Sequence, residues 1–262
     1  MGKLKVYRYE LAPEVEAVGL GVYLRKHGAL LIADLHIGYE QALSEQGIYI
    51  PSVQYGSMKR LLEAMLDETG AEKVVIVGDL KHEFGSALRQ EWSETLDLLR
   101  FLKERGVEVE VVRGNHDNFL IPILKREGVP LHDPVLVMED VALVHGHKPL
   151  PIEVYSGDLS YVIMGHEHPA IVLRDELGVK MKFKCFLLGS YEGLNLLVLP
   201  AFSPLMPGTE VNVYDKSRFL SPILQDANID AFRVFVTDLD AGIYDMGTVA
   251  ATKALSLGLW SV

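Results

Sequence analysis

The sequence predicts an α/β fold in which two mixed β-sheets pack together and helices flank them. The first half alternates apolar strand-like runs with amphipathic helical runs, and such β-α-β-α-β units form parallel strands. The second half holds short strand-like runs with close turns, which favours a second and more antiparallel sheet. No linker or low-complexity segment separates the halves, so we expect residues 1–262 to form one domain.

The first sheet is expected from three runs rich in β-branched residues, at 29–33, 73–77 and 108–112. Between these runs, apolar residues recur at helical spacing over 53–69 and 87–105. Pro51 lies near the start of the first helical run and Gly106 follows the second, as is typical of helix ends.

The second sheet is expected from six shorter runs, at 135–138, 141–145, 161–164, 171–173, 180–188 and 194–199. The segment RDELGV at 174–179 has the composition of a hairpin turn. We therefore expect the runs on either side of it to be antiparallel neighbours.

Composition and charge limit the class of protein. No apolar run is long enough to span a membrane, and the N-terminus lacks the apolar stretch of a signal peptide, so we expect a cytoplasmic protein without membrane contact. The net charge of −11 means that the surface as a whole will not attract nucleic acid, and any phosphate-binding region must be local. The single cysteine, Cys185, lies in an apolar stretch and is expected to be a buried, inert thiol.

Polar residues follow five of the expected strands, where ligands bind in open α/β sheets. The five segments are Asp34-Leu35-His36, Gly78-Asp79-Leu80-Lys81-His82, Arg113-Gly114-Asn115-His116-Asp117, His145-Gly146-His147 and Gly165-His166-Glu167-His168. Of the nine histidines, only His27 and His132 lie outside these segments, and we expect those two to be ordinary surface residues.

Each segment taken singly has an ordinary structural interpretation. Gly-Asp after a strand is usually a turn, Asn-His can begin a helix, and H-G-H or G-H-E-H can be a solvated turn. Five consecutive strand ends that all deliver His, Asp or Asn are hard to produce by chance, and together they favour a metal centre.

Oxygen and imidazole ligands without thiolate suit Mn²⁺, Fe or Zn²⁺. Two such ions about 3.5–4 Å apart can activate water and clamp the oxygens of a phosphate. Two divalent cations against Asp34 and Asp79 would leave the pocket about two units positive, so an acidic protein can still bind a phosphoester.

The ordered set D-x-H, G-D, G-N-H-D, H and G-H-x-H, from Asp34 to His168, resembles that of the calcineurin-like metallophosphoesterases. The resemblance implies a metal-dependent phosphoesterase with the four-layer sandwich of that family. GDLKH at 78–82 resembles the GDLxH of SbcD-type DNA-repair nucleases. The segments HGHKP at 145–149, MGHEHP at 164–169 and LPAFSPLMPGTEVN at 199–212 resemble a smaller branch, which holds archaeal SbcD-related phosphoesterases and bacterial ligase-associated PdeM proteins. The long capping and ATPase-contacting region of the full repair nucleases has no counterpart, which argues against processive duplex exonuclease activity.

The resemblance implies two metal sites that share one ligand. The first would be held by Asp34, His36, Asp79 and His168, and the second by Asp79, Asn115, His145 and His166. His116 would face the scissile phosphate and protonate or stabilise the leaving oxygen instead of binding metal. His82 stands where nuclease-like members have a substrate-side histidine, and we expect it to contact the phosphate or His116.

Several residues near the motifs keep two interpretations at this point. Asp117 either caps its turn or orients a neighbouring ligand, and Arg113 either touches phosphate or makes a structural pair. The proline-rich segment 200–208 is either a stiff packed loop or a wall of the substrate cleft. His147 and Glu167 are expected either behind the ligands or in solvent.

The leading hypothesis is a phosphodiesterase with two divalent ions, Mn²⁺ foremost, that acts on DNA or RNA and prefers single-stranded or short substrates. His82 and Lys81 would lie near the incoming phosphate. The alternative is a phosphoesterase for a cyclic nucleotide or nucleotide derivative, which the acidic charge and the lack of a Lys/Arg run favour. A third hypothesis, an inert scaffold that binds protein partners, conflicts with the intact ligand set and with His116.

Overall fold

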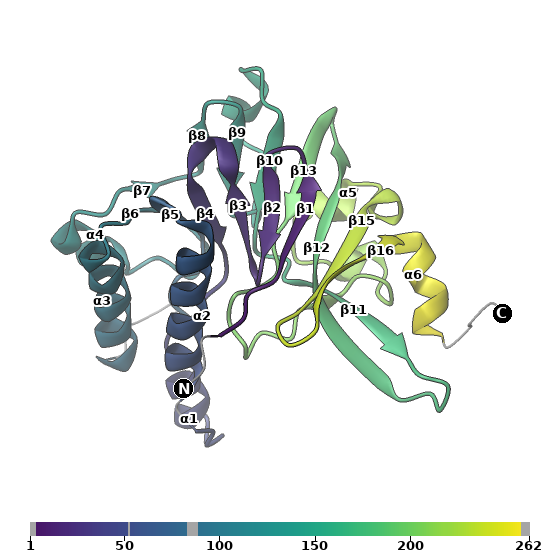
Figure 1. Ribbon diagram of the computed structural model, residues 1–262, viewed down its shortest axis with the longest axis horizontal. Coiled ribbons are helices and arrows are strands. Elements are labelled where there is room, and N and C mark those ends of the chain that lie inside the picture. The colour runs from purple at the N-terminus through teal and green to yellow at the C-terminus, as the bar shows by residue number, and fades with distance from the viewer. Residues whose placement is uncertain (1–3, 52, 83–88, 258–262) are drawn as a thin grey trace.

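Two mixed β-sheets pack face to face in the computed structural model, with helices outside them (Figure 1). The structure describes residues 4–51, 53–82 and 89–257. The predicted fold class is therefore confirmed. None of the described helices combines the length and apolar character needed to cross a bilayer.

The first sheet has seven strands, which lie side by side in chain order. They are β1 (Arg8–Ala12), β2 (Val15–Val18), β3 (Gly21–Leu24), β4 (Ala29–Ile32), β5 (Lys73–Val77), β6 (Glu108–Val112) and β7 (Leu131–His132). Neighbours from β1 to β4 are antiparallel, whereas those from β4 to β7 are parallel. The parallel centre is the one predicted, and β1 to β3 extend it.

Helices make the crossovers between the parallel strands. The segment between β4 and β5 holds α1 (Tyr39–Glu45) and α2 (Gln54–Thr69), α3 (Arg89–Glu104) connects β5 to β6, and α4 (Ile121–Glu127) leads to β7. The helix predicted over 53–69 is confirmed, and Gly70, with a φ of 65°, ends it. The helix predicted over 87–105 is confirmed from Arg89 onward, and residues 87 and 88 lie outside the described residues.

The second sheet has nine strands and is mixed. They are β8 (Val135–Met138), β9 (Val141–Val144), β10 (Tyr161–Met164), β11 (Pro169–Arg174), β12 (Lys180–Tyr191), β13 (Leu194–Val198), β14 (Thr209–Glu210), β15 (Arg233–Asp238) and β16 (Gly242–Thr248). β9, β10 and β13 are parallel neighbours, whereas β11 and β12 form the predicted antiparallel hairpin. The sheet is thus mixed, as predicted, and β9, β10 and β13 are its parallel part.

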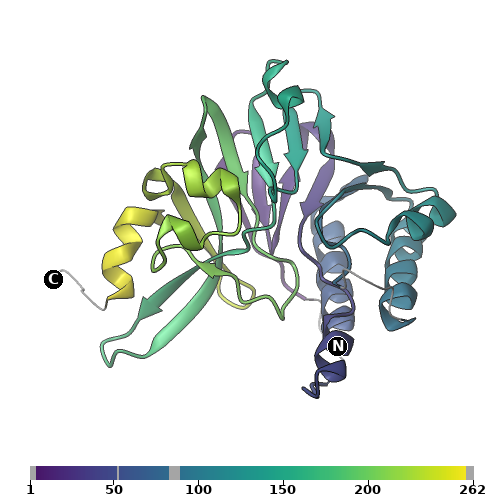
Figure 2. The same ribbon diagram turned by 180° about the vertical axis from the view of Figure 1, so that it is seen from behind.

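The remaining helices are α5 (Pro222–Asp226), α6 (Val249–Ser256) and four short 3₁₀ helices, η1 (Arg25–His27), η2 (Ile152–Tyr155), η3 (Lys216–Arg218) and η4 (Ile229–Ala231). The helices α1 to α4 lie at one side of the molecule, and α6 and the β11–β12 hairpin lie at the other (Figures 1 and 2). Cys185 on β12 is fully buried, and burial raises the pKa of its thiol, as expected for an inert cysteine.

The core between the sheets fixes how the two sets of strand ends meet. Leu31 and Val75 from the first sheet pack in one cluster with Leu143 and Ile163 from the second. β9 and β10 are in register, so that the turns after both strands begin at the same level. The parallel strands of both sheets can therefore deliver their following residues to one place.

The two histidines expected on the surface are instead partly buried beside carboxylates. His27 Nε2 lies 3.2 Å from Asp140 Oδ1, and His132 Nε2 lies 2.6 Å from Glu110 Oε2. These acidic partners hold both rings. The pairs were not predicted because the partners lie far away in the sequence.

Candidate metal centre

The carboxyl ends of β4, β5, β6, β9 and β10 bring the polar segments of the sequence together. Three groups of side chains there have potential ligand atoms within 4.8 Å of one another, namely Asp34–His36–His168, Asp79–His145–His166 and His36–His82–His116. Each of the first two groups draws residues from both sheets. We call them the Asp34 group and the Asp79 group.

The Asp34 group is compact, with Asp34 and His36 buried and His168 half-buried. His168 Nε2 lies 3.1 Å from Asp34 Oδ1 and 3.5 Å from His36 Nε2. The other carboxylate oxygen of Asp34 accepts a hydrogen bond of 2.9 Å from the backbone N–H of His166. Asp34 Oδ1, by contrast, is buried and accepts no well-formed hydrogen bond from the described residues, although His168 Nε2 lies near it. A buried oxygen of this kind requires a compensating positive partner.

The Asp79 group is oriented by the backbone. His145 Nδ1 donates to the carbonyl of Val77 at 3.1 Å, which directs Nε2 toward the other candidate ligands. That nitrogen lies 3.2 Å from Asp79 Oδ2 and 3.1 Å from the side-chain oxygen of Asn115. Asp79 Oδ2 is also 3.9 Å from His36 Nε2 in the Asp34 group. Asp79 therefore lies between the two groups.

Five of the candidate ligands have left-handed backbone conformations. The φ angles are positive at Asp34, His36, Asp79, His166 and His168, with values from 47° to 68°. Such a conformation is unusual for a residue with a side chain and costs about 1–3 kcal/mol each. Strain concentrated in this way on the residues of one cluster is typical of a functional site.

Two glycines of the motifs allow the close packing around these side chains. A Cβ on Gly114 would lie 2.1 Å from Asp79 Oδ1, and a Cβ on Gly78 would lie 2.1 Å from His145 Nδ1. Neither neighbour can move without displacing a candidate ligand. The glycines of the G-D and G-N-H-D motifs are thus required by close approach.

The charges of the cluster also favour cations. Burial disfavours the Asp79 carboxylate, but His145 and the other nearby imidazoles outweigh that effect and hold its pKa well below its ordinary value. Burial likewise disfavours the His145 imidazolium, yet Asp79 and Asp34 raise its pKa to about 9. Burial lowers the pKa of His36 to about 3 and that of His166 to about 4, so both rings are neutral and can offer a lone pair.

The residues present fit a pair of divalent cations. The donors are carboxylate, amide and imidazole groups, which suit Mn²⁺, Fe and Zn²⁺. The buried Asp34 Oδ1, which lacks a well-formed hydrogen bond from the described residues, and the position of Asp79 between the two groups point to the same conclusion.

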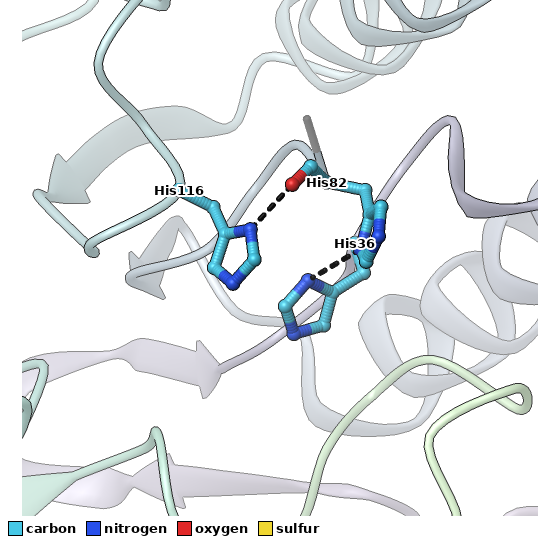
Figure 3. Close-up of side chains that lie close together, drawn as sticks. All are labelled: His36, His82 and His116. Atoms are coloured by element: carbon cyan, nitrogen blue, oxygen red, sulfur yellow. Dashed lines mark hydrogen bonds between the residues drawn. The ribbon is translucent and has the colours of Figure 1, made fainter. Parts of the chain in front are cut away.

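His82 and His116 lie beside the Asp34 group (Figure 3). His116 Nδ1 donates to the backbone carbonyl of His82, and His116 Nε2 lies 3.9 Å from Asp79 Oδ2. His82 Nδ1 lies 3.4 Å from His36 Nδ1, and its ring stacks on that of His116. Burial, followed by the nearby His116, lowers the pKa of His82 to about 4, which makes its ring neutral near pH 7.

Asp117 and Arg113, left with two interpretations each by the sequence, both make structural contacts. Asp117 is fully buried and accepts the backbone N–H of Asp79 at 2.9 Å and that of Gly114 at 2.8 Å. Burial, and next the charge of Asp79, raise its pKa to about 6. Arg113 donates to Asp133 at 2.8 Å and to the side chain of Asn118.

Lys81 does not lie where the sequence analysis placed it. It is fully buried, and its Nζ is 4.0 Å from Glu91 Oε1 on α3, so it does not face an incoming phosphate. The backbone of Lys81 forms an isolated parallel bridge with Ile37, which continues the sheet beyond β5. Glu91 also accepts the backbone N–H of His82 at 2.9 Å.

The other residues near the motifs pack behind the candidate ligands. Glu167 is buried and accepts the backbone N–H groups of Leu220 and Ser221. The His147 ring lies 5.2 Å from that of His145, and its buried Nδ1 has no hydrogen-bond partner among the described residues. The segment 200–208 packs against the end of β4, with the side chain of Phe202 in the core under α2 and α3.

Sequence reasoning missed the residues that support the site from other elements. They are Gln54 on α2, Glu91 on α3, Lys184 on β12 and Ser203 in the segment after β13. None of them belongs to a local motif, because each reaches the site only through the tertiary fold. Lys184 and Ser203 have mostly apolar neighbours in the sequence, whereas Gln54 and Glu91 lie in polar stretches and carry no such signal.

A two-sheet α/β sandwich that carries this donor set at its strand ends defines a metal-dependent hydrolase of phosphate esters. The sequence pattern of the calcineurin-like phosphoesterases matches residues 29–170, more than half of the chain, and the chain belongs to that family. The family uses a dinuclear centre of divalent metal ions, and the Asp34 and Asp79 groups supply candidate ligands for one.

Solved structures similar to this chain include a nuclease and a phosphoesterase. The Pseudomonas putida nuclease MPE has a TM-score of 0.63 and 21% sequence identity, over 88% of this chain and 96% of that one. YfcE, a phosphoesterase from E. coli, has a TM-score of 0.42 and 18% identity, over 84% of this chain and 98% of that one. No curated protein matches the chain significantly. The similarity to the nuclease establishes the shared fold.

Proposed function

We propose that the protein is a dinuclear-metal phosphodiesterase that cleaves nucleic acid, with single-stranded or short molecules preferred. Asp34, His36 and His168 would hold the first ion, and Asn115, His145 and His166 the second, with Asp79 shared. The two ions, most suitably Mn²⁺, would supply an activated water and neutralise the phosphate oxygens. We also propose that residues 1–262 act as one domain, because residues of both sheets share the core between them.

One observation supports this proposal above the others: two imidazoles that belong to neither the Asp34 nor the Asp79 group lie on one side of the cluster. His116 is tied to the backbone of His82 through Nδ1, and its Nε2, 3.9 Å from Asp79 Oδ2, would protonate a leaving oxygen. The neutral His82 ring next to it is suited to contact a phosphate without adding a full charge.

The two cationic residues of the motifs, Arg113 and Lys81, are engaged elsewhere, and this favours a diester over a monoester as substrate. Arg113 is engaged by Asp133 and Asn118, and Lys81 is buried beside Glu91. Neither is placed as a clamp for the dianion of a terminal phosphate. A diester carries one negative charge and leaves an ester group that His82 and His116 could contact.

The nuclease MPE from Pseudomonas putida shares the fold, and its name agrees with this substrate class. At 21% sequence identity the likeness concerns the fold alone, so the substrate is argued from the residues of the site. The net charge of −11 instead favours a small phosphoester, because binding of long duplex depends on several cationic contacts to phosphates. A cyclic nucleotide or nucleotide derivative is therefore the second candidate.

A substrate panel with Mn²⁺ tests the proposal. It would contain a phosphodiester dye, a phosphomonoester dye, single-stranded DNA, RNA, long duplex DNA and cyclic nucleotides. Asp79→Asn protein, purified in the same way, would be the control for contaminating nucleases. We expect faster diester than monoester hydrolysis, and cleavage of single-stranded oligonucleotides above long duplex.

Comparable or faster monoester hydrolysis, with no oligonucleotide cleaved, would overturn the nucleic-acid proposal. Rapid turnover of a cyclic nucleotide in that case would support the second candidate. Equal activity in the Asp79→Asn control would assign the signal to a contaminant.

A further inference from the structure

The Asp34–His36 turn is held from two sides by hydrogen bonds to residues of other elements. We call these hydrogen bonds, and those that fix the contacting residues, the brace. On one side its backbone N–H groups bond to the turn after β5, from Asp34 to Gly78 and from His36 to Asp79, each at 3.0 Å. These contacts place the turn next to the Asp79 group. They leave its carbonyl groups facing the opposite way, where the segment after β13 lies.

That segment, Ala201 to Ser203, supplies the other side of the brace. Phe202 N–H donates to the carbonyl of Ala33 at 2.8 Å, and Ser203 N–H donates to the carbonyl of Asp34 at 3.2 Å. The left-handed Asp34 therefore has both backbone polar groups bonded to different parts of the chain. The segment can hold this conformation only if its own position is fixed.

Gln54 extends the brace to the rest of the turn. Its side-chain nitrogen lies 3.3 Å from the carbonyl of Leu35, 3.2 Å from that of His36 and 2.6 Å from Ser203 Oγ. Gln54 and Ser203 are both almost fully buried. One amide thus ties the turn to the segment after β13 without touching a candidate ligand atom.

Lys184 on β12 fixes the segment from behind. Its Nζ donates to the carbonyl of Ala201 at 2.6 Å and also to that of Ser203, the residues on either side of Phe202. Burial lowers the pKa of this amine to about 7. Burying an amine is costly unless it is hydrogen-bonded, and this one donates to two loop carbonyls. It therefore holds the segment in a fixed position.

We propose that Lys184 and Gln54 are positioning residues that set the metal affinity of the Asp34 group and leave that of the Asp79 group largely unchanged. The inference rests on the ligand assignment proposed above. Asp34 and His36 bind a cation well only when their strained turn is held in place. The brace stabilises that turn before any ion arrives, in the way that residues behind metal ligands commonly orient them.

The test measures Mn²⁺ binding to metal-free, full-length protein by calorimetry and by elemental analysis after gel filtration. Lys184→Met removes both hydrogen bonds and keeps the apolar length of the side chain. We expect one of the two binding events to weaken about 10–100-fold and the other to keep its affinity. After gel filtration, about one ion per chain should remain.

The matched control is Lys182→Met. Lys182 lies two residues earlier on the same strand and donates to the carbonyl of Gly208, at the far end of the same loop. It does not contact Ala201 or Ser203, so both binding events should match those of the unsubstituted protein. Gln54→Met reaches the brace from α2 and should repeat the selective loss seen for Lys184→Met.

Wild-type affinities at both sites in Lys184→Met, or an equal loss at both, would overturn the inference. Loss of cooperative thermal unfolding in both metal-free brace variants would overturn it too, because that result would assign the residues to the core. Fewer than two ions in the unsubstituted protein would instead contradict the dinuclear centre itself, so the two failures can be told apart.

Discussion

The backbone carbonyl of His82 accepts the Nδ1 hydrogen of His116. Because the acceptor belongs to the backbone, it survives any substitution of the His82 side chain. The orientation of His116 and the chemistry of the His82 ring can therefore be studied separately.

His116→Ala should keep both metal ions and lose catalysis. A positioned acid contributes about 10²–10⁴-fold, so kcat/KM on an unactivated dinucleotide should fall by that factor. A nitrophenyl diester, whose leaving group needs little protonation, should lose much less. Steady-state kinetics on the two substrates, with metal content measured in parallel, checks this. Loss of metal, or near-full activity on the dinucleotide, would contradict the acid role.

His82→Ala should lower diester cleavage while two Mn²⁺ ions still bind at saturating metal. The substitution leaves the backbone carbonyl that holds His116, so the loss reports the imidazole alone. We expect about a tenfold or larger fall in kcat/KM, within the range known for positioned acid–base groups. An unchanged diester rate would remove His82 from the substrate side.

Asp79→Asn should weaken both ions together. Asp79 Oδ2 lies 3.2 Å from His145 Nε2 and 3.9 Å from His36 Nε2, so its charge serves both groups. Elemental analysis at limiting Mn²⁺ should show less than one ion per chain. One ion retained at wild-type affinity would show that the carboxylate is not shared.

Asp117→Ala should destabilise the metal-free protein by about 1–3 kcal/mol, because the buried N–H groups of Asp79 and Gly114 lose their acceptor. Urea denaturation measures this change. The comparison is Asp230→Ala, which removes an exposed carboxylate paired with Lys253 and should cost about 1 kcal/mol or less. Equal effects of the two substitutions would contradict the orienting role of Asp117.

Glu110→Gln should destabilise the protein at neutral pH and have little effect in acid. Burial would raise the pKa of Glu110, but the bonds from Lys73 and His132 outweigh it and lower the pKa below its ordinary value. A carboxyl whose folded pKa is lowered adds stability above its unfolded pKa and loses it as the pH falls through the folded pKa.

Denaturation of metal-free wild type and Glu110→Gln at several pH values measures that difference, which we expect to be about 1 kcal/mol at pH 7. The gap should close below the ordinary pKa of a glutamate. A gap that is constant across the range would show that the Lys73 and His132 contacts contribute nothing through the charge.

The parallel centre of the first sheet could be predicted because its strands are continuous β-branched runs, and the bounds of β5 and β6 match the predicted ones to the residue. β1 and β2 escaped prediction because they are short and carry charged residues, Arg8 and Glu10 at exposed positions and Glu16 at a partly buried one. β15, RVFVTD, is nearly as apolar as β6 and could have been predicted from its alternation.

The candidate ligands could be predicted because each directly follows a strand, so the order of motifs along the chain maps onto one edge of the fold. Lys81 was placed wrongly because its burial depends on Glu91, which reaches it from α3. Gln54 and Lys184 could not be predicted, because they come from elements far apart in the chain and form no local sequence motif.

The candidate ligands are divided between the two sheets. Asp34, His36, Asp79 and Asn115 follow strands of the first, whereas His145, His166 and His168 follow strands of the second. Cations held by both sets would staple the halves of the sandwich, so that the sheets could part only by giving up the ions. The free energy of unfolding would then rise by about 1.4 kcal/mol per site for each tenfold increase in the free metal concentration above the dissociation constant. The stability of the folded protein would therefore depend on the concentration of free metal around it.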